Sequence, residues 1–233
     1  MTPTDFVEQL YRDFDWRFNE VRRLQNIITR EGEEAARDEL RKSLIVVLYA
    51  HFEGFCVFSL EHYLTAMNQA SITCGSAAPA IIAGAFERVF NAMEHGDQKC
   101  KVFSKSLPND AGLHRHWRRR HFIEEFERLL ERRVAIPNDV IDAESNLKPD
   151  VLRRNLFILG LDHTFVDPYA DAIHNLLARR NRIAHGEDRR PVQLKEYSDY
   201  EGAVFEICYH LIEFLDEAYR GERYLRPVPE YAV

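Results

Sequence analysis

Residues 44–60, LIVVLYAHFEGFCVFSL, are apolar on almost every side of a helix. At about 100° per residue, the large side chains from Leu44 to Leu60 leave no continuous polar face to meet water. A helix of this kind has to be surrounded by other helices. The segment therefore predicts a long central, buried helix, from about Glu34 to about Asn68, in an all-α domain.

Amphipathic segments on both sides of this stretch predict the helices that surround it. Their apolar residues recur at three- and four-residue steps, and no period-two strand pattern of useful length appears. Asp167-Pro168 is a typical N-cap and first-turn pair, and Gly186 is typical of a helix end. The expected helices are residues 5–30, 79–96, 115–133, 149–160, 168–185 and 197–219, with residues 97–114 irregular.

These elements predict one all-α helical bundle over residues 1–233. Its core is expected from residues 34–70 and 149–220, with residues 71–148 as a helical elaboration inserted between them.

The composition indicates a folded cytoplasmic protein. Of 233 residues, 45% are hydrophobic and 12% aromatic, which excludes a disordered chain. The net charge of −7 disfavours non-specific coating of nucleic acid, so any RNA contact has to be local. Four widely spaced cysteines predict neither a disulfide framework nor a zinc site. There is no secretion signal, and the longest uninterrupted apolar run, Leu44–Ala50, is too short to span a bilayer. We expect no membrane association, metal or cofactor.

The segment Arg179–Gly186, RRNRIAHG, carries the side chains best suited to chemistry. Arg180 can clamp a phosphate with two parallel hydrogen bonds, and His185 can move a proton near neutral pH. Asn181, an amide donor and acceptor, lies four residues before His185 on the same helix face. The alternative is a basic last turn whose cations suit the helix dipole.

Two polar residues in the apolar helix, His51 and Glu53, are candidate supporting residues. A carboxylate in such surroundings needs a partner. Glu53 either forms a structural ion pair with a core-facing arginine, or partners Arg180 or orients His185. His51 either lies on the rim of the same site or is a hydrogen-bonded core histidine.

Further basic residues are candidate RNA contacts. In the segment from His114 to Phe122, basic residues alternate with aromatic ones, a pattern that can hold single-stranded RNA by phosphate contacts and stacking. The alternative is a solvated helix face, because glutamates follow at ion-pair spacing. No carboxylate or cysteine spacing completes a metal site with the histidines. The candidate RNA contacts are Trp117, Arg118, Arg119 and Arg120 in this segment, and Arg179 and Arg182 in the first one.

Three segments resemble the HEPN superfamily. Arg180–His185, followed by one last long helix, is similar to the Arg-x4–6-His motif of that superfamily. Leu48–Phe55, and the stretch from Ser145–Pro149 to Leu159–Asp162, resemble a larger HEPN subfamily from bacterial defence and toxin-type loci. The resemblance covers residues 35–220 approximately.

The resemblance implies a metal-independent endoribonuclease, with Arg180 and His185 as the catalytic pair and Asn181 as an adjunct. Its products would be a 2′,3′-cyclic phosphate and a 5′-hydroxyl. It also implies a homodimer with two motifs facing each other, and a toxin or antiphage effector with an antitoxin or defence-system partner protein. The main alternative is a non-catalytic HEPN module that binds a partner protein or a nucleotide. A helical scaffold with an accidental motif is the third interpretation.

Overall fold

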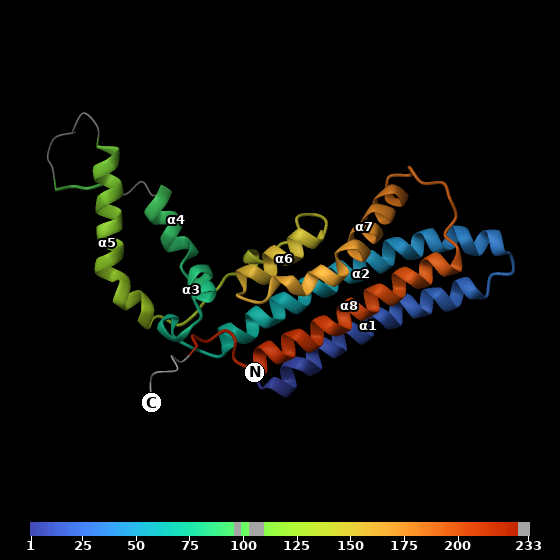
Figure 1. Ribbon diagram of the computed structural model, residues 1–233, viewed down its shortest axis with the longest axis horizontal. Helices are drawn as coiled ribbons and strands as arrows, with labels where there is room; N and C mark the ends of the chain where they lie inside the picture. The colour runs from blue at the N-terminus through green and yellow to red at the C-terminus, as the bar shows by residue number, and fades with distance from the viewer. Residues whose placement is uncertain (96–98, 103–109, 228–233) are drawn as a thin grey trace.

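The computed structural model describes residues 1–95, 99–102 and 110–227. Within these ranges the secondary-structure elements are all helices (Figure 1). Two isolated bridges, Thr73 with Arg133 and Ala77 with Leu225, are the β-type pairings found there. The predicted all-α class is confirmed.

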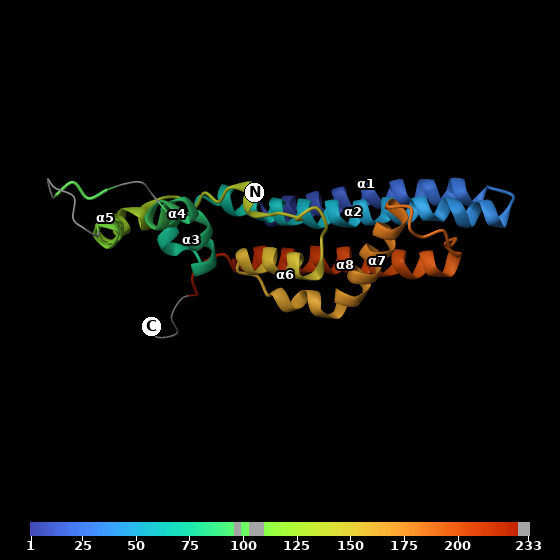
Figure 2. The same ribbon diagram turned by 90° about the horizontal axis from the view of Figure 1, so that it is seen from above.

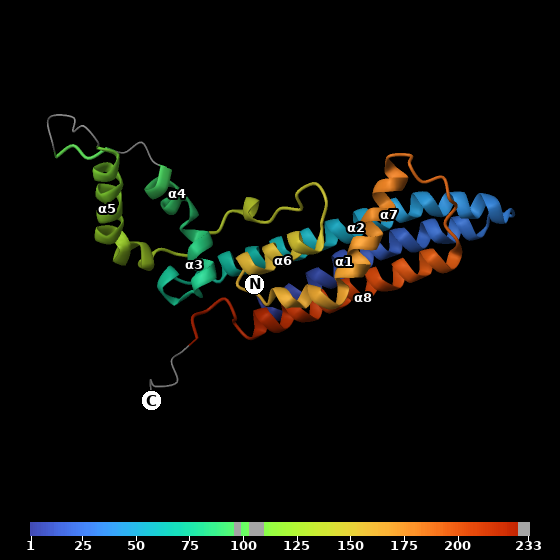
Figure 3. The same cartoon turned by 45° about the horizontal axis from the view of Figure 1, so that its top comes forward.

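Three long helices, α1 (Pro3–Thr29), α2 (Glu34–Gln69) and α8 (Leu194–Arg220), pack along one another (Figures 1 and 3). The helix α7 (Ala170–Ala184) crosses them and contacts both α2 and α8. Figure 2 shows α1 and α2 in one layer and α6 (Pro149–Ile158), α7 and α8 in the other. The central position predicted for α2 is therefore confirmed.

The core forms around α2 because its apolar side chains point in all directions. Tyr49, Phe52, Phe55 and Cys56 are all buried, as predicted for the stretch from Leu44 to Leu60. By length and composition α2 could cross a membrane, but 56% of its most apolar window is buried inside this structure. Packing in the bundle accounts for its apolar character.

The helix α1 belongs to the same core, although the core expected from residues 34–70 and 149–220 omitted it. Its buried face consists of apolar side chains at three- and four-residue steps, which pack against α2 and α8. These are Phe6, Leu10, Phe14, Phe18 and Val21.

Two predicted helix boundaries are wrong. Residues 79–96 were expected as one helix, but α3 (Pro79–Ala85) and α4 (Glu87–His95) are separated at Phe86, whose ring is buried. The helix α5 (Ala111–Glu131) begins inside the segment expected to be irregular, because the His114 N–H already bonds the Asp110 carbonyl at 2.9 Å. Residues 96–98 and 103–109 of that segment lie outside the described residues.

Asp167-Pro168 does not start a helix as predicted. Both residues lie inside a 3-10 helix, η3 (His163–Tyr169), and α7 begins after it at Ala170. The Asp167 carboxylate instead accepts hydrogen bonds of 3.0 and 2.9 Å from Arg153 on α6. The Asp167 oxygen that was expected to cap the helix is therefore bonded to Arg153 instead.

The helices α3, α4 and α5 lie together at one end of the molecule (Figure 1). The segment that follows α5 is bonded to α2 at Ile136. The Asn68 side chain donates to the Ile136 carbonyl at 2.9 Å and accepts from the Ile136 N–H at 3.0 Å. The chain then runs back along the bundle to α6. The division into a smaller core and an elaboration over residues 71–148 stays a prediction.

We expect Phe55→Ala to destabilise the fold strongly. The Phe55 ring is 0% exposed and meets Phe14 edge-on, with ring centroids 5.7 Å apart. Removing it leaves a cavity between α1 and α2 that costs about 3–5 kcal/mol. Urea unfolding followed by circular dichroism measures the loss. The control is Phe157→Ala, at a ring that is 67% exposed, with an expected change within about 0.5 kcal/mol. Equal stability of the two variants would contradict the central role of α2.

Candidate functional site

The segment Arg179–Gly186 forms the end of α7. Gly186 takes the left-handed conformation with φ of +69°, and its N–H bonds the Ile183 carbonyl at 3.0 Å. The Glu187 N–H bonds the Arg182 carbonyl at 2.9 Å, which completes a Schellman motif. The helix therefore ends where the sequence predicted. His185 is its exposed C-cap residue, and its imidazole has no hydrogen-bond or ion-pair partner in the described part of the chain.

Arg180 is half-buried and held by neutral groups. Its Nη1 donates to the side-chain oxygens of Asn146 at 3.0 Å and Asn181 at 2.7 Å. Its guanidinium carbon lies 4.8 Å from the centroid of the Tyr49 ring, a cation–π contact. Among residues 1–95, 99–102 and 110–227, no carboxylate pairs with it. Arg180 therefore keeps a positive charge that no neighbouring carboxylate cancels.

Tyr49, which is buried, and Glu53, which is partly buried, form a polar pair next to Arg180. The Tyr49 hydroxyl donates to Glu53 Oε2 at 2.8 Å, and the Leu147 N–H donates to both side chains, at 2.8 and 3.0 Å. Burial, and then the bond to Glu53, raise the pKa of Tyr49 far above its ordinary value. The hydroxyl therefore stays protonated and remains a donor.

Glu53 thus differs from both expectations. Among the described residues it forms no ion pair with a core arginine, and it contacts neither Arg180 nor His185 directly. Its partners are a tyrosine hydroxyl and a backbone N–H, which satisfy the partly buried carboxylate instead. Glu53 reaches Arg180 only through Tyr49.

The loop that carries Asn146 has an unusual backbone. Glu144 and Ser145 are consecutive non-glycine residues in the left-handed region, with φ of 48° and 66°. Such conformations are costly and persist when surrounding contacts impose them. Here Asn155 on α6 donates to the Asp142 carbonyl at 2.9 Å, and Leu147 is buried. The loop therefore presents Asn146 to Arg180 from a fixed backbone.

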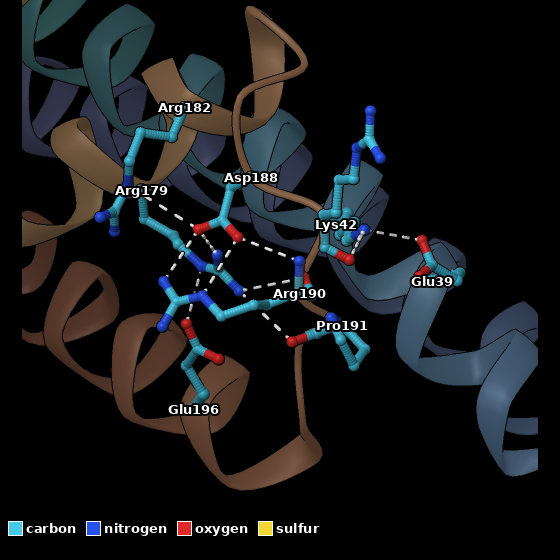
Figure 4. Close-up of polar contacts among 9 residues, drawn as sticks. Glu39, Lys42, Arg179, Arg182, Asp188, Arg190, Pro191 and Glu196 are labelled. Atoms are coloured by element: carbon cyan, nitrogen blue, oxygen red, sulfur yellow. Dashed lines mark hydrogen bonds and ion pairs between the residues drawn. The ribbon is translucent and has the colours of Figure 1, made fainter.

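Arg179, the neighbour of Arg180, is entirely structural. It is 2% exposed, its Nε donates to Glu196 at 2.8 Å, and its Nη1 pairs with Asp188 (Figure 4). Its Nη2 donates to the carbonyl oxygens of Arg190 and Pro191, at 3.5 and 3.4 Å. The expectation that Arg179 contacts RNA is wrong, because all three nitrogens are already engaged inside the protein.

Asp188 is the centre of this ion-pair cluster. Besides Arg179, it pairs with Arg190 at 2.9 Å and lies 3.8 Å from Arg182, whose side chain is half exposed. Hydrogen bonds from the Arg190 side chain and backbone, and then the Arg179 guanidinium, hold the pKa of Asp188 far below its ordinary value. The cluster fixes the loop between α7 and α8 over α2, where the Lys42 ammonium also bonds the Arg189 carbonyl at 2.9 Å.

His51 lies on a different face of α2 from the site. Its Nε2 is 3.4 Å from Glu20 and its ring meets Trp16 edge-on, both on α1. Two residues along a helix turn the side chain by about 200°, so His51 and Tyr49 face opposite neighbours. Burial lowers the pKa of His51. A place on the rim of the site is therefore wrong. His51 is partly buried against α1 and lies beside the Glu20 carboxylate, rather than being a hydrogen-bonded histidine of the core.

The basic segment of α5 lies at the far end of the molecule from α7 (Figures 1 and 2). Arg118 donates to the Met93 carbonyl on α4 at 2.8 Å, and Arg120 pairs with Glu124 at 2.7 Å. Trp117 contacts the His121 ring, and Arg119 is exposed. These contacts support the alternative of a solvated helix face, and an RNA contact at Trp117, Arg118, Arg119 or Arg120 stays a prediction. Nowhere in the described ranges do three or more metal-ligating His, Cys, Asp or Glu side chains gather.

Sequence reasoning missed two residues of the site, Tyr49 and Asn146. Both lie in segments that carried the family resemblance, yet neither was singled out, because their partners are far away in the chain. The three segments Leu48–Phe55, Ser145–Pro149 and Arg179–Gly186 meet around the Arg180 guanidinium. Their convergence at one place is the main finding about the site.

A family model described as HEPN_MAE_28990-like HEPN matches residues 6–224, nearly the whole chain and all three converging segments. A search of curated proteins and a search of solved structures each returned no match.

We expect Asp188→Asn to lower the melting temperature at pH 7, because Arg179 would lose one of its two carboxylate partners. The folded-state pKa of Asp188 is depressed, so its stabilisation is complete above the ordinary value of 3.8. That stabilisation is lost as the pH falls further toward the folded-state pKa. Below pH 4 the wild type should therefore approach the variant in stability. Thermal melts from pH 2.5 to 7 measure this.

The matched control is Glu187→Gln, since Glu187 is the exposed neighbouring acid. It should melt as the wild type does. A constant difference between wild type and Asp188→Asn across the pH range would contradict the role given to the carboxylate.

Proposed function

Because the chain belongs to the HEPN_MAE_28990-like HEPN family, we propose that it is a metal-independent endoribonuclease with Arg180 and His185 as its catalytic residues. One observation carries this proposal. Of two adjacent arginines, Arg179 is neutralised by Asp188 and Glu196, while the contacts of Arg180 within the described residues are to amide oxygens and an aromatic ring. A cation kept without a carboxylate partner is available for an anion such as a phosphodiester.

The reaction that fits these groups is transesterification within RNA. The 2′-oxygen attacks the neighbouring phosphorus and loses its proton, the bond from phosphorus to the 5′-oxygen breaks, and that oxygen takes up a proton. The products are a 2′,3′-cyclic phosphate and a 5′-hydroxyl. His185 is exposed and suited to the proton transfer, and Arg180 stabilises the charge that develops on the phosphoryl oxygens. Asn181 accepts from Arg180, which leaves its amide N–H groups for the substrate.

A homodimer would complete the site. The attacking 2′-oxygen and the leaving 5′-oxygen lie in line on opposite sides of the phosphorus, so the two proton transfers are best served by two separate imidazoles, and a second copy of His185 across a two-fold axis supplies the other one. Five arginines within residues 179–190 would repel across such an axis, but Asp188 already neutralises part of that charge within each chain.

The resemblance to defence and toxin-type proteins supports a role as a toxin or antiphage effector, with RNA as substrate and an antitoxin or defence-system protein as partner. The alternative is a HEPN module that binds a partner protein or a nucleotide without cleaving RNA. In that case Arg180 would bind an anionic group, and the measurements below would find no cleavage.

We expect the purified protein to cut single-stranded RNA in the presence of EDTA. Arg180→Ala and His185→Ala should each lower the rate by about a hundredfold or more, the range for general acid–base groups and charge-stabilising donors. Gel electrophoresis of end-labelled RNA gives the rate, and enzymatic analysis of the ends identifies the cyclic phosphate.

Two variants serve as controls. His174→Ala removes an exposed histidine from the same helix, and Arg220→Ala removes one positive charge from the far end of α8. Both should cleave as the wild type does. A strict requirement for Mg²⁺ or Mn²⁺ would refute the mechanism, and unchanged cleavage by Arg180→Ala or His185→Ala would refute the assignment of that residue.

We expect a homodimer in light scattering at micromolar concentration, with RNA affinity that falls as salt rises. If both chains contribute to one site, mixing Arg180→Ala protein with His185→Ala protein should restore a small part of the activity, since each mixed site then contains one intact Arg180 and one intact His185, which is enough to catalyse one of the two proton transfers. A strict monomer, or no recovery on mixing under exchange conditions, would exclude the composite site.

A further inference from the structure

We propose that Asn146 and Tyr49 are positioning residues that orient Arg180, so that it meets a phosphate with its Nε–Nη2 edge. The inference rests on the proposed function for its substrate, a phosphodiester. It concerns a different question, namely how the guanidinium is oriented before any substrate arrives.

The hydrogen bonds decide which edge of the guanidinium is available. Nη1 carries two N–H groups, and these are directed to two oxygens, on Asn146 and Asn181. A guanidinium offers a carboxylate or phosphate two parallel donors, either from Nη1 and Nη2 or from Nη2 and Nε. The first pair is lost here. The Nε–Nη2 edge has no hydrogen-bond partner in the described ranges, so it is the edge left for a bidentate contact.

The face of the guanidinium is fixed by Tyr49. The ring is fully buried on α2, and its hydroxyl bonds both Glu53 and the Leu147 N–H. With its far end tied at two points, the ring cannot slide beneath the guanidinium. Oriented in this way, Arg180 needs no reorganisation when charge develops on the substrate.

The chemistry of Asn146 matters as much as its place. A neutral amide oxygen orients Arg180 without cancelling its charge, whereas an aspartate at the same position would form an ion pair like that of Arg179 with Asp188. The left-handed Glu144 and Ser145 precede Asn146 directly, and a strained backbone of this kind is found at sites where a side chain must be held in one place. Asn146 is therefore suited to hold Arg180 while leaving it charged.

The test compares Asn146→Ala and Asn146→Asp in the full-length protein, in wild-type and Arg180→Ala backgrounds. One readout is the single-turnover cleavage rate on a pool of random-sequence RNA. The other is the affinity for the same pool made with 2′-O-methyl RNA, which cannot be cleaved, measured by fluorescence anisotropy at several salt concentrations.

We expect Asn146→Ala to lower the cleavage rate by about tenfold to a hundredfold with little change in affinity, since a misplaced group costs rate more than binding. Asn146→Asp should weaken binding and reduce the salt dependence by about one phosphate contact, as Arg180→Ala does. In the Arg180→Ala background both substitutions should have no further effect, because the residue that they act through is gone.

Tyr49 is tested in the same way. Tyr49→Phe keeps the ring under Arg180 but removes the two bonds that hold its far end, so the rate should fall, though less than in Tyr49→Leu. Tyr49→Leu removes the ring and should lower the rate as Asn146→Ala does. Two matched controls lie on α2. Tyr63→Phe removes a buried hydroxyl that has no hydrogen-bond partner among the described residues, and Asn68→Ala removes the side chain that ties α2 to Ile136. Asn68→Ala should lower the melting temperature without lowering the rate.

The outcomes separate this inference from the proposed function. If the wild type cleaves no RNA, the endoribonuclease proposal fails, and the affinity for 2′-O-methyl RNA still decides the role of Asn146. Wild-type affinity and salt dependence in Asn146→Asp would overturn the inference. The inference would also be overturned if the Asn146 substitutions lowered the cleavage rate or the affinity by the same factor in the Arg180→Ala background. Asn146 would then act on stability rather than through Arg180.

Discussion

The structure depends on the burial of α2. A helix that is apolar all round is stable in water only when other helices cover it, and α1, α7 and α8 do so. This packing buries Tyr49 and partly buries Glu53, polar residues on the same helix. Their hydroxyl and carboxylate then need partners, and they find each other and the Leu147 N–H. The site is thus built on the polar groups that the central helix carries into the interior.

Arg179 and Arg180 are adjacent on α7, but Arg179 stabilises the fold and Arg180 is the candidate functional residue. Adjacent residues project about 100° apart, so one arginine faces the loop between α7 and α8 and the other faces α2. Carboxylates surround the first, and its charge helps hold that loop. Amide oxygens and an aromatic ring surround the second, and its charge is retained. The same residue type serves two purposes because the neighbouring side chains differ.

The candidate site contains left-handed backbone conformations, which also occur at Ser71, Gly160 and Glu222 elsewhere in the protein. Glu144 and Ser145 are left-handed immediately before Asn146, and Gly186 is left-handed immediately after His185. Glycine takes this conformation at little cost, whereas the other two residues need the contacts of α6 with their loop to hold them there. In both places the chain changes direction next to a polar side chain of the candidate site, Asn146 in one and His185 in the other. The rigid bundle supplies the stability that such local strain requires.

The sequence by itself determined the helical class, the central place of α2, the end of α7 at Gly186 and the family resemblance, because these depend on periodicity and on residues close together in the chain. It placed Arg180, Asn181 and His185 at that helix end, but not the partners that distinguish Arg180 from Arg179. Those partners were decided by tertiary structure. Asn146 lies 34 residues from Arg180, and Leu147 lies 98 residues from Tyr49. Tertiary contacts also explain two expectations that failed. Asp167 bonds Arg153 instead of capping a helix, and Glu53 bonds a backbone N–H rather than an arginine. A hydrogen bond forms with whichever group packing brings within reach, and helical periodicity does not specify which helices come together.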